Sequence, residues 1–296
     1  MVGRSALAHT NASKYEVLSP SRQELDLMDF GAVVDFLRLN KPDFIVHAAG
    51  KVGGIKANIE DPYGFLIENV TLGSNIIRAA KECGIKKLLN LGSSCIYPRD
   101  GTAPLEENSI LAGSLESTNE GYALSKIIAI RACEYITQQF DQFSYKTIIP
   151  CNLYGPFDKF DGNSAHLIPA IITKLHTAVR DGHKTVEIWG DGSARREFMF
   201  SGDLGGLIWE ACSQFDNMPH IMNAGIGRDY SVKEYYEIAA SVIGFEGGFE
   251  FDTSQPVGAA QKLTSSKNAL AWGWSPNTDL RTGIAKTYEF YKGLNC

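Results

Sequence analysis

The chain has 296 residues, of which 44% are hydrophobic and 21% are charged, and its formal net charge is −6. This composition is that of an ordinary globular protein, with enough residues for one large domain or two smaller ones. The acidic balance argues against nucleic acid as the main partner, and no apolar run approaches the ~20 residues of a membrane span. We therefore expect neither a nucleic-acid partner nor a membrane partner.

The cysteines are scattered along the chain without any C-x-x-C spacing. Such a pattern argues against a disulfide framework and against a zinc site, so we expect no metal. The first residues also contain no apolar stretch of the kind that a signal peptide needs. Together these features predict a protein of the reducing cytoplasm.

The first half of the chain alternates strand-like and helix-like segments. Strands are predicted over residues 15–18, 44–48, 87–91 and 146–150, and helices over 30–37, 62–82 and 120–140. Asp61 followed by Pro62 is a typical helix start, because the aspartate caps free backbone N–H groups and proline fits the first turn. This alternation predicts an α/β fold with a doubly wound parallel sheet that helices cover on both faces.

The pattern changes after Pro156. A helix is predicted over 165–180, strands over 186–189 and 249–251, and a closing helix over 280–291, while Ser231 and Glu234 form a capping box. We interpret these elements as a smaller α/β domain of residues 165–200 and 231–296. It would cover a sheet domain made of residues 1–164 and 201–230.

The start of the chain is unusual for a doubly wound sheet. Such sheets begin with a strand that leads into a glycine-rich turn, where phosphates meet a helix N-terminus. Here the first residues look like the end of a G-x-x-G-x-x-G turn, with Gly3 as its last glycine. Loss of a central strand would leave its neighbours ~10 Å apart with unpaired backbone. We therefore hypothesise that the sequence is a truncated or mis-started version of a longer chain, without its first strand.

A serine, a tyrosine and a lysine form the most informative group. The predicted strand 87–91 runs out into Gly92, Ser93 and Ser94, and the next predicted helix carries Tyr122 and Lys126. Residues four apart share a helix face, so we expect the lysine to lower the pKa of the phenol. The phenol can then exchange a proton with a substrate oxygen that one of the serines also binds. An isolated Y-x-x-x-K is more often helix surface; the serine-ended strand upstream favours a catalytic site.

Several longer motifs accompany this group. They are KVGGI (51–55), LGSSCIYP (91–98), TNEGYALSK (118–126), PCNLYGPFDKFDGNSAHLIPA (150–170) and RREF (195–198). This set resembles the GDP-L-fucose synthase family, within the extended short-chain dehydrogenase/reductase superfamily, along nearly the whole chain. The resemblance implies a Rossmann-type domain that binds NADP(H) and a smaller domain that binds a GDP-sugar. It also implies 3,5-epimerisation and C4 reduction of GDP-4-keto-6-deoxymannose to GDP-L-fucose.

The resemblance also implies roles for individual side chains. Cys95 and His166 would exchange protons at C3 and C5, which the C4 ketone acidifies, and their ordinary pKa values of ~8.5 and ~6.5 suit this near neutral pH. Ser93 and Tyr122 would hydrogen-bond the C4 oxygen, and Lys126 would tune Tyr122 and hold the nicotinamide ribose. Outside such a motif, a cysteine at a strand end is more often core packing, and a histidine before a helix is as often a helix cap.

Further residues are assigned to ligands by the same resemblance. Arg22 would meet the adenosine 2′-phosphate, which favours NADP over NAD, and Arg196 would meet the substrate diphosphate. The implied cofactor residues are Gly3, Arg22, Ala48, Ala49, Lys126, Asn152, Leu153 and His166, and the implied substrate residues are Lys174, Trp189, Arg196 and Lys262. Taken alone, lysines and loop arginines are often simply solvated, and a tryptophan is as often a core residue.

The sequence departs from the family in two places. Gly121 replaces a usual proline, and residues 255–263 (QPVGAAQKL) lack the usual acidic and arginine residues near the GDP end. One alternative is therefore a C4 reductase of a GDP-4-keto-6-deoxy-heptose. Another, if the truncation is real, is a cofactor-free scaffold. The family pairs helices 61–82 and 120–140 into a four-helix bundle, so we expect a homodimer.

Overall fold

The computed structural model describes residues 1–161, 165–255 and 259–294. Residues 162–164, 256–258 and 295–296, among them Asn163, Ser164 and Cys296, lie outside the described residues. The helices are α1 Val2–Ala8, α2 Phe30–Asn40, α3 Ile55–Glu60, α4 Pro62–Glu82, α5 Glu120–Gln139, α6 Leu167–Asp181, α7 Ser201–Ser213, α8 Val232–Ile243, α9 Lys267–Trp272 and α10 Leu280–Leu294. The strands are β1 Phe44–His47, β2 Lys87–Leu91, β3 Ser144–Pro150, β4 Asn152–Tyr154, β5 Thr185–Trp189, β6 Arg195–Arg196, β7 Phe198–Phe200, β8 Ile221–Ala224, β9 Tyr230–Ser231, β10 Gly248–Asp252 and β11 Gln261–Lys262.

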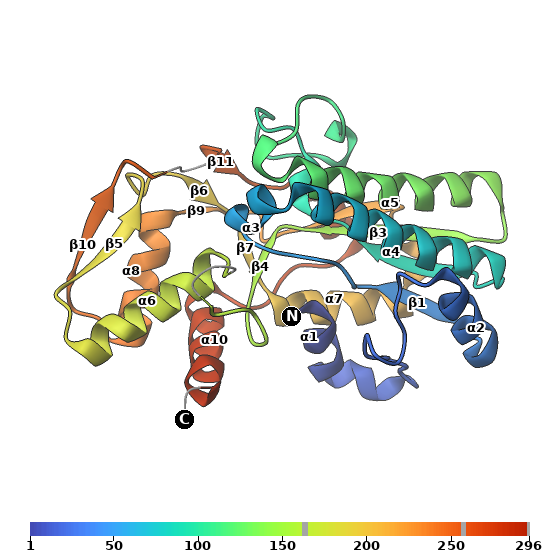
Figure 1. The fold of residues 1–296 in the computed structure, drawn as a ribbon, viewed down its shortest axis with the longest axis horizontal. Helices are drawn as coiled ribbons and strands as arrows, with labels where there is room; N and C mark the ends of the chain where they lie inside the picture. Colours follow the sequence, from blue (N-terminus) through green and yellow to red (C-terminus); the bar gives the residue numbers. More distant parts are fainter. Residues whose placement is uncertain (162–164, 256–258, 295–296) are drawn as a thin grey trace.

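The main sheet has the strand order β1-β2-β3-β8, and all its strands are parallel. Helices α4 and α5 lie on one side of this sheet, and α1 and α7 lie on the other (Figure 1). Leu88 packs into the core beneath α4, whereas the next residue, Leu89, packs into the core beneath α7. Such two-sided burial explains the nearly continuous apolar strands. The predicted α/β fold with a doubly wound parallel sheet is confirmed.

Helices α4 and α5 approach closely at their N-terminal ends. Asp61 caps α4 as predicted, because its Oδ1 accepts a hydrogen bond from the Gly64 backbone N–H at 2.9 Å. Gly121 lies in the first turn of α5, where an added Cβ would come within 2.8 Å of the Pro62 carbonyl oxygen. A glycine at this departure from the family pattern therefore lets the two helix ends meet.

The smaller lobe has its own apolar core, formed by α6, α8, α10 and the parallel pair β5–β10. Figure 1 shows these elements grouped away from the main sheet, with the C-terminus at the end of α10. The predicted capping box is present: Ser231 Oγ accepts from Glu234 N at 3.1 Å, and a Glu234 carboxylate oxygen accepts from Ser231 N at 2.6 Å. Among the described helices, none is long and apolar enough to cross a membrane.

Glu197 joins the two lobes. It lies between β6 and β7, and its buried carboxylate accepts hydrogen bonds from Gly227 N (2.9 Å), Thr264 N (2.9 Å) and Thr264 Oγ1 (2.6 Å). Its backbone carbonyl also accepts from Asn152 Nδ2 at 3.0 Å. Burial raises the pKa of Glu197, and the hydrogen bonds from Thr264 and Gly227 act in the opposite direction. The carboxylate thus fastens three chain segments that are distant in sequence.

The prediction of a strand over residues 15–18 is wrong. This segment is extended but pairs with no strand in the described part of the chain. The Tyr15 ring instead stacks on Trp209 of α7 at 5.1 Å between centroids. A cavity of about 1460 Å³ has residues 15–18 and β1 among its walls. β-propensity favours an extended chain, but a strand also requires a neighbouring strand within hydrogen-bonding distance.

Candidate active site

The predicted serine–tyrosine–lysine group assembles where β2 meets α5. The chain leaves β2 and turns through Ser93 into a short 3-10 helix, Ser94–Ile96. The Ser93 hydroxyl lies beside the Tyr122 phenol, close enough to act on its pKa as a hydrogen-bonding group, and Ser93 Oγ accepts a hydrogen bond from the Cys95 backbone N–H at 3.4 Å. Of the two candidate serines, the structure places Ser93 against the tyrosine.

Lys126 lies one helical turn after Tyr122 and is 8% exposed. Its Nζ donates a hydrogen bond to the Leu91 carbonyl oxygen at 3.0 Å and lies 5.7 Å from the centre of the Tyr122 ring. Burial lowers the pKa of Lys126 from 10.5 to about 8, while the charge on Cys95 acts to raise it. The lysine is therefore mostly protonated at neutral pH, and the end of β2 holds it beside the phenol.

The expectation that Lys126 lowers the pKa of Tyr122 is wrong for this structure. Burial raises the pKa of Tyr122 far above 10, and the charge on Cys95 raises it further, while the hydrogen bond to Ser93 acts to lower it. The tyrosine ring also packs edge-on against Phe65 of α4, with 6.4 Å between centroids. Desolvation disfavours the phenolate more than one nearby cation favours it. Tyr122 is therefore a neutral phenol, the form that donates a proton to a ketone oxygen.

Cys95 is buried beside this group. Burial raises the pKa of its thiol, whereas the charge of Lys262, the hydrogen bond to Ser93 and the charge of Lys126 act to lower it. The same side chain belongs to an apolar cluster with Ile96 and Tyr97. Cys95 is thus both a packed residue and a neighbour of the tyrosine and lysine.

His166 immediately precedes α6, but its side chain makes no capping hydrogen bond, so the helix-cap interpretation is wrong. Its Nδ1 lies 3.7 Å from the Asp158 carboxylate. His166 and Cys95 lie on different segments, one directly before α6 and the other after β2. Their joint action on one sugar ring stays a prediction.

The large cavity of about 1460 Å³ brings together part of the predicted cofactor residues. Its walls include Gly3, Arg22, Ala48 and Ala49. These residues fit a phosphorylated dinucleotide, because the alanines let a ligand approach the end of β1 and Arg22 offers forked donors to a phosphate. Gly50 also lines the cavity, and a Cβ there would lie 3.8 Å from Lys126 Nζ. Lys126 therefore lies near one end of this space.

The remaining predicted cofactor residues lie elsewhere. Asn152 and Leu153 form most of β4, which pairs with β7, and neither they nor His166 line the large cavity. The structure thus separates the cofactor residues into a group at the cavity and a group at the junction of the lobes.

Two predicted substrate residues are neighbours on paired strands. Arg196 of β6 and Lys262 of β11 are partners in the parallel ladder. Burial lowers the pKa of both residues, and Glu116 acts to raise both values. Lys262 also acts to lower the pKa of Cys95, so this cation lies near the thiol and Arg196 lies beside it on the paired strand.

The other two predicted substrate residues also lie together. Lys174 Nζ is 5.6 Å from the centre of the Trp189 ring and donates a hydrogen bond to the Glu187 carbonyl oxygen at 3.1 Å. Trp189 is 54% exposed, so the core-tryptophan alternative is wrong. Burial lowers the pKa of Lys174, which distinguishes it from a fully solvated lysine.

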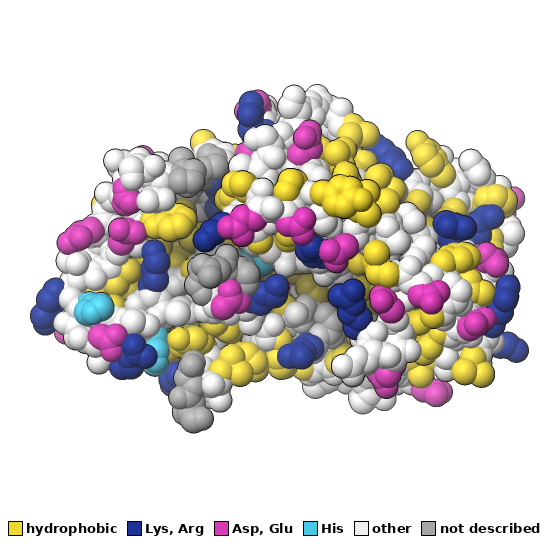
Figure 2. Space-filling model, viewed as in Figure 1, with side chains coloured by type: hydrophobic (Ala, Val, Ile, Leu, Met, Phe, Trp, Pro, Cys, Tyr) yellow, Lys and Arg dark blue, Asp and Glu magenta, His cyan; other side chains and the backbone are white. Residues whose placement is uncertain are grey.

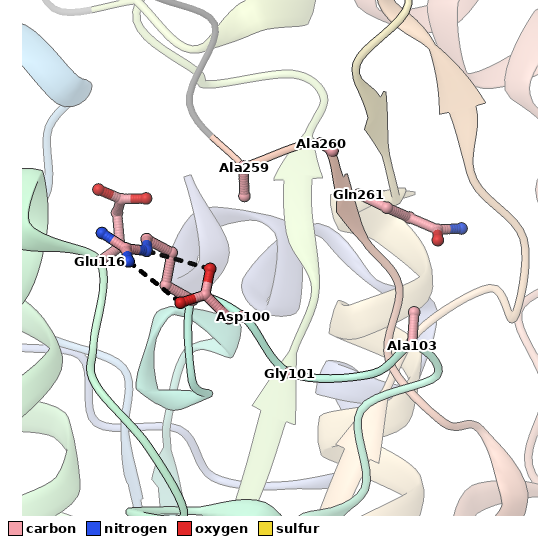
Figure 3. A pocket seen from close by; sticks show the side chains of 8 residues that line it. Asp100, Gly101, Ala103, Glu116, Ala259, Ala260 and Gln261 are labelled. Atoms are coloured by element: carbon pink, nitrogen blue, oxygen red, sulfur yellow. Dashed lines mark hydrogen bonds and ion pairs between the residues drawn. The ribbon is translucent and has the colours of Figure 1, made fainter.

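A second pocket, of about 510 Å³, has in its wall Gln261 of β11, the residue directly before Lys262 (Figure 3). It is lined by Arg99, Asp100, Gly101, Ala103, Glu116, Ala259, Ala260 and Gln261. Figure 3 shows Asp100 ion-paired on one side and the segment from Ala259 to Gln261 on the other. The chain therefore departs from the family pattern at a pocket wall, directly before Lys262.

His47 was not singled out from the sequence as a site residue. It is the last residue of β1 and is buried. Burial lowers its pKa to about 3, and the charge of Lys126 lowers it further, so the imidazole is neutral. Its position directly before an Ala-Ala-Gly turn, at the carboxyl end of a buried strand, was the available signal.

Asn69 was also missed. Its Oδ1 accepts a hydrogen bond from Lys51 N at 2.8 Å, and its Nδ2 donates to the Lys51 carbonyl oxygen at 3.0 Å. The Lys51 ammonium binds Asp61 at 2.7 Å and Glu68 at 2.6 Å. These contacts fasten the loop after β1 to α4. The KVGGI motif marked the loop, but the residues that hold it are distant in sequence.

Comparison with known proteins places this geometry in a family. Residues 1–225 match the NAD dependent epimerase/dehydratase family. The chain belongs to this family. It is similar to a GDP-L-colitose synthase of Yersinia pseudotuberculosis, with 50% identity over 98% of this chain and 94% of that protein. It is also similar to a GDP-L-fucose synthase of Azorhizobium caulinodans, with 46% identity over 98% of this chain and 93% of that protein.

A solved structure supports the same assignment. The GDP-mannoheptose C4 reductase from Campylobacter jejuni with NADP bound matches this epimerase-family chain with a TM-score of 0.88 at 28% identity, over 98% of this chain and 95% of that one. The predicted enzyme class is therefore confirmed: the chain is an NAD(P)-dependent epimerase/reductase of the extended short-chain dehydrogenase/reductase type.

Proposed function

We propose that this epimerase-family enzyme converts GDP-4-keto-6-deoxymannose to GDP-L-fucose with NADPH, by epimerisation at C3 and C5 and reduction at C4. The observation that carries the proposal is that the groups for proton exchange and the groups for ketone reduction lie next to one another in a single site. The thiol of Cys95, suited to proton exchange at carbon, lies against the Ser93–Tyr122–Lys126 group, which is suited to ketone reduction. The fucose synthase relative supports the sugar, and the NADP-bound reductase supports the cofactor.

The reduction uses groups that the structure has already brought together. NADPH, when bound, supplies a hydride for the C4 carbon. Ser93 and Tyr122 hold the C4 oxygen, and the neutral Tyr122 phenol donates its proton to that oxygen as negative charge develops. Lys126, fixed by the Leu91 carbonyl, stabilises the phenolate that remains. Neutral His47 behind it adds no competing charge.

The epimerisation precedes the reduction, because only the ketone acidifies the neighbouring C–H bonds. Loss of a proton from C3 or C5 gives an enolate whose oxygen the same Ser93 and Tyr122 hydrogen-bond. Cys95 and His166 remove and return protons on opposite faces of the ring, which inverts each centre. Arg196 and Lys262 bind the diphosphate and hold the ring still during both proton transfers.

The direct test offers GDP-4-keto-6-deoxymannose and NADPH to the purified chain in D₂O. We expect NADPH oxidation and a GDP-L-fucose product with solvent deuterium at C3 and C5. Bound NADPH without oxidation would reject this substrate. A folded chain that binds no NADPH would favour the scaffold alternative. A reduced product without deuterium at these carbons would favour the heptose-type C4 reductase.

A second candidate substrate is the 3-deoxy counterpart of this ketone. L-Colitose is the 3-deoxy form of L-fucose, and a GDP-L-colitose synthase is 50% identical to this chain. Only C5 would then be inverted. Offering both keto sugars together in equal amounts gives the ratio of their kcat/KM values from the ratio of products. A mixture dominated by the colitose product would reassign the sugar and keep the chemistry.

We also infer that the protein is cytoplasmic, which agrees with the free thiols of its described cysteines. We further infer a homodimer in which α4 and α5 pack against their copies in the partner subunit. Hydrophobic side chains gather over these helices (Figure 2). The exposed ones are Tyr63, Ile67, Leu124, Ile128 and Tyr135. A stable dimer usually covers such a patch.

Substituting Ile128→Glu should convert the dimer to a monomer, because a carboxylate would be buried in an apolar interface. Light scattering coupled to gel filtration measures the mass. Leu270→Glu on α9 is the matched control, because Leu270 is also an exposed aliphatic residue but lies away from α4 and α5. A dimer that survives Ile128→Glu would contradict this interface.

A further inference from the structure

Asp158 and His166 form a partly buried pair whose polar atoms are incompletely satisfied, and the His166 side chain is 33% exposed. His166 Nδ1 lies 3.7 Å from Asp158 Oδ1, and the Asp158 side chain is only 5% exposed. Within the described residues, His166 Nδ1 and Asp158 Oδ2 are both buried without a hydrogen-bond partner. Leaving such atoms unpaired costs stability. A small approach of the two side chains would satisfy the ring nitrogen, and catalytic hydrogen bonds often tighten only when substrate is bound.

The backbone conformation before Asp158 orients its carboxylate toward His166. Phe157, directly before it, has a φ of 69°, a left-handed conformation that a bulky residue rarely adopts. The Phe157 ring packs against Phe290 of α10 at 5.0 Å and under the Arg4 guanidinium at 5.8 Å. Asp158 Oδ1 accepts a hydrogen bond from the Lys159 backbone N–H at 2.9 Å. The packed phenylalanine and the turn therefore hold the aspartate toward the start of α6.

We propose that Asp158 is a positioning residue that accepts the Nδ1–H of His166 and so presents Nε2 to the sugar ring. This inference rests on the proposed acid–base role of His166. A neutral imidazole carries its proton on one nitrogen only, and a carboxylate at Nδ1 selects the tautomer in which Nε2 is free. Without Asp158, the ring could turn or keep its proton on Nε2, and it would then fail as a base.

The proton transfers balance without any further reactant. When His166 acts as the base, Nε2 takes a proton from the sugar carbon, an enolate forms, and the ring becomes an imidazolium. The Cys95 thiol then gives its proton to the opposite face of that carbon and becomes a thiolate. At the other centre the thiolate takes the proton and the imidazolium returns one from Nε2, so both groups regain their starting forms. The Nδ1–H stays with Asp158 in both directions. The carboxylate takes no proton in either direction and stabilises the imidazolium, as in other aspartate–histidine pairs.

The test uses Asp158→Asn, which keeps the shape of the side chain but can donate to Nδ1 and so favour the wrong tautomer. Ser93, Tyr122 and Lys126 are untouched, so we expect NADPH oxidation within about threefold of wild type. The ketone would then be reduced before it is inverted, and the fraction of epimerised product should fall at least tenfold. Asp158→Glu keeps the carboxylate and should restore part of that fraction. Asp141→Asn, an exposed carboxamide change after α5, is the control and should match wild type.

A second readout is independent of the substrate. Nitrogen-15 NMR of the His166 ring in the whole protein should show a protonated Nδ1 in wild type and a protonated Nε2 in Asp158→Asn. An unchanged tautomer together with an unchanged product ratio would overturn the proposal. Equal losses of NADPH oxidation and epimerisation would also overturn it, because they indicate a structural role. An inactive wild-type chain with the expected tautomer shift would reject the substrate but keep the pair.

Discussion

Replacing Tyr122 with phenylalanine should lower the rate of NADPH oxidation by ~10²–10⁴-fold, the usual contribution of a positioned acid or base. The Tyr122 side chain is partly buried beside Ser93, and its phenol is neutral because burial raises its pKa. The phenylalanine ring fills the same space but has no proton to donate to the C4 oxygen. Steady-state kinetics with saturating keto sugar, beside circular dichroism to show an intact fold, measures the effect.

The two adjacent serines provide a matched pair for the same chemistry. Ser93→Ala removes the hydrogen-bond partner of Tyr122 and should also lower the rate, since the C4 oxygen loses one of its donors. Ser94→Ala changes the next residue, which is more deeply buried than Ser93 but has no described bond to the tyrosine. Equal losses from both serine variants would contradict the geometry. A Tyr122→Phe enzyme with near-normal turnover would contradict the assignment of the proton donor.

Replacing Lys126 with methionine should remove most activity and yet make the protein more stable at neutral pH. A lowering of the lysine pKa from 10.5 to about 8 corresponds to ~3 kcal/mol, at ~1.4 kcal/mol per tenfold change in proton affinity. Loss of the hydrogen bond to the Leu91 carbonyl destabilises the variant by ~1 kcal/mol, which offsets part of this gain. We therefore expect the free energy of unfolding of Lys126→Met, measured by urea titration at pH 7, to be ~1–3 kcal/mol higher than that of the wild type.

The pH dependence gives this prediction a definite sign. Below pH 8 the lysine is charged in both the folded and the unfolded chain, so the full cost of burying the ammonium is present. Between about 8 and 10.5 the folded lysine is neutral while the unfolded one is still charged. The cost of burying the ammonium therefore falls steadily as the pH rises and vanishes near pH 10.5. The stability advantage of Lys126→Met should shrink over that range. Wild-type turnover should fall as the pH rises through about 8, because the cation beside Tyr122 is lost.

Lys146 is the matched control. It is also a buried lysine, but its Nζ donates to the carbonyl oxygens of Phe215 (2.6 Å), Asp216 (3.1 Å) and Met218 (2.6 Å), away from the site. Lys146→Met leaves these carbonyls unpaired, so we expect lower stability and normal turnover of the folded enzyme. A Lys126→Met variant that is destabilised as much as Lys146→Met would contradict the view that burial of the Lys126 ammonium lowers the stability of the wild type.

The sequence could predict those elements whose signals are local. Asp61 and Pro62 mark the start of α4, and Ser231 and Glu234 mark the start of α8, because capping involves only neighbouring residues. The segment 15–18 failed for the opposite reason. Its residues favour an extended chain, but whether a ladder forms depends on which strand lies beside it.

The candidate site divides in the same way. The order of Ser93, Tyr122 and Lys126 along a strand end and a helix was sufficient to predict their meeting. The direction of the Tyr122 pKa was not, because it depends on burial against α4, which no local pattern reports. Asp158 was visible in a quoted motif, but its pairing with His166 depends on the left-handed turn at Phe157. A contact that depends on tertiary packing in this way cannot be predicted from a local pattern in a single sequence.

The carboxylate of Glu197 bears on how the enzyme moves. Two-lobed enzymes that close over a ligand bend at a few unencumbered residues between the lobes. Here the junction is a buried anion whose donors, Gly227 and Thr264, come from two other segments. Swinging the lobes apart would strip those donors from a carboxylate that burial already disfavours. These hydrogen bonds therefore oppose an opening of the junction, and we expect the angle between the lobes to change little when a ligand binds.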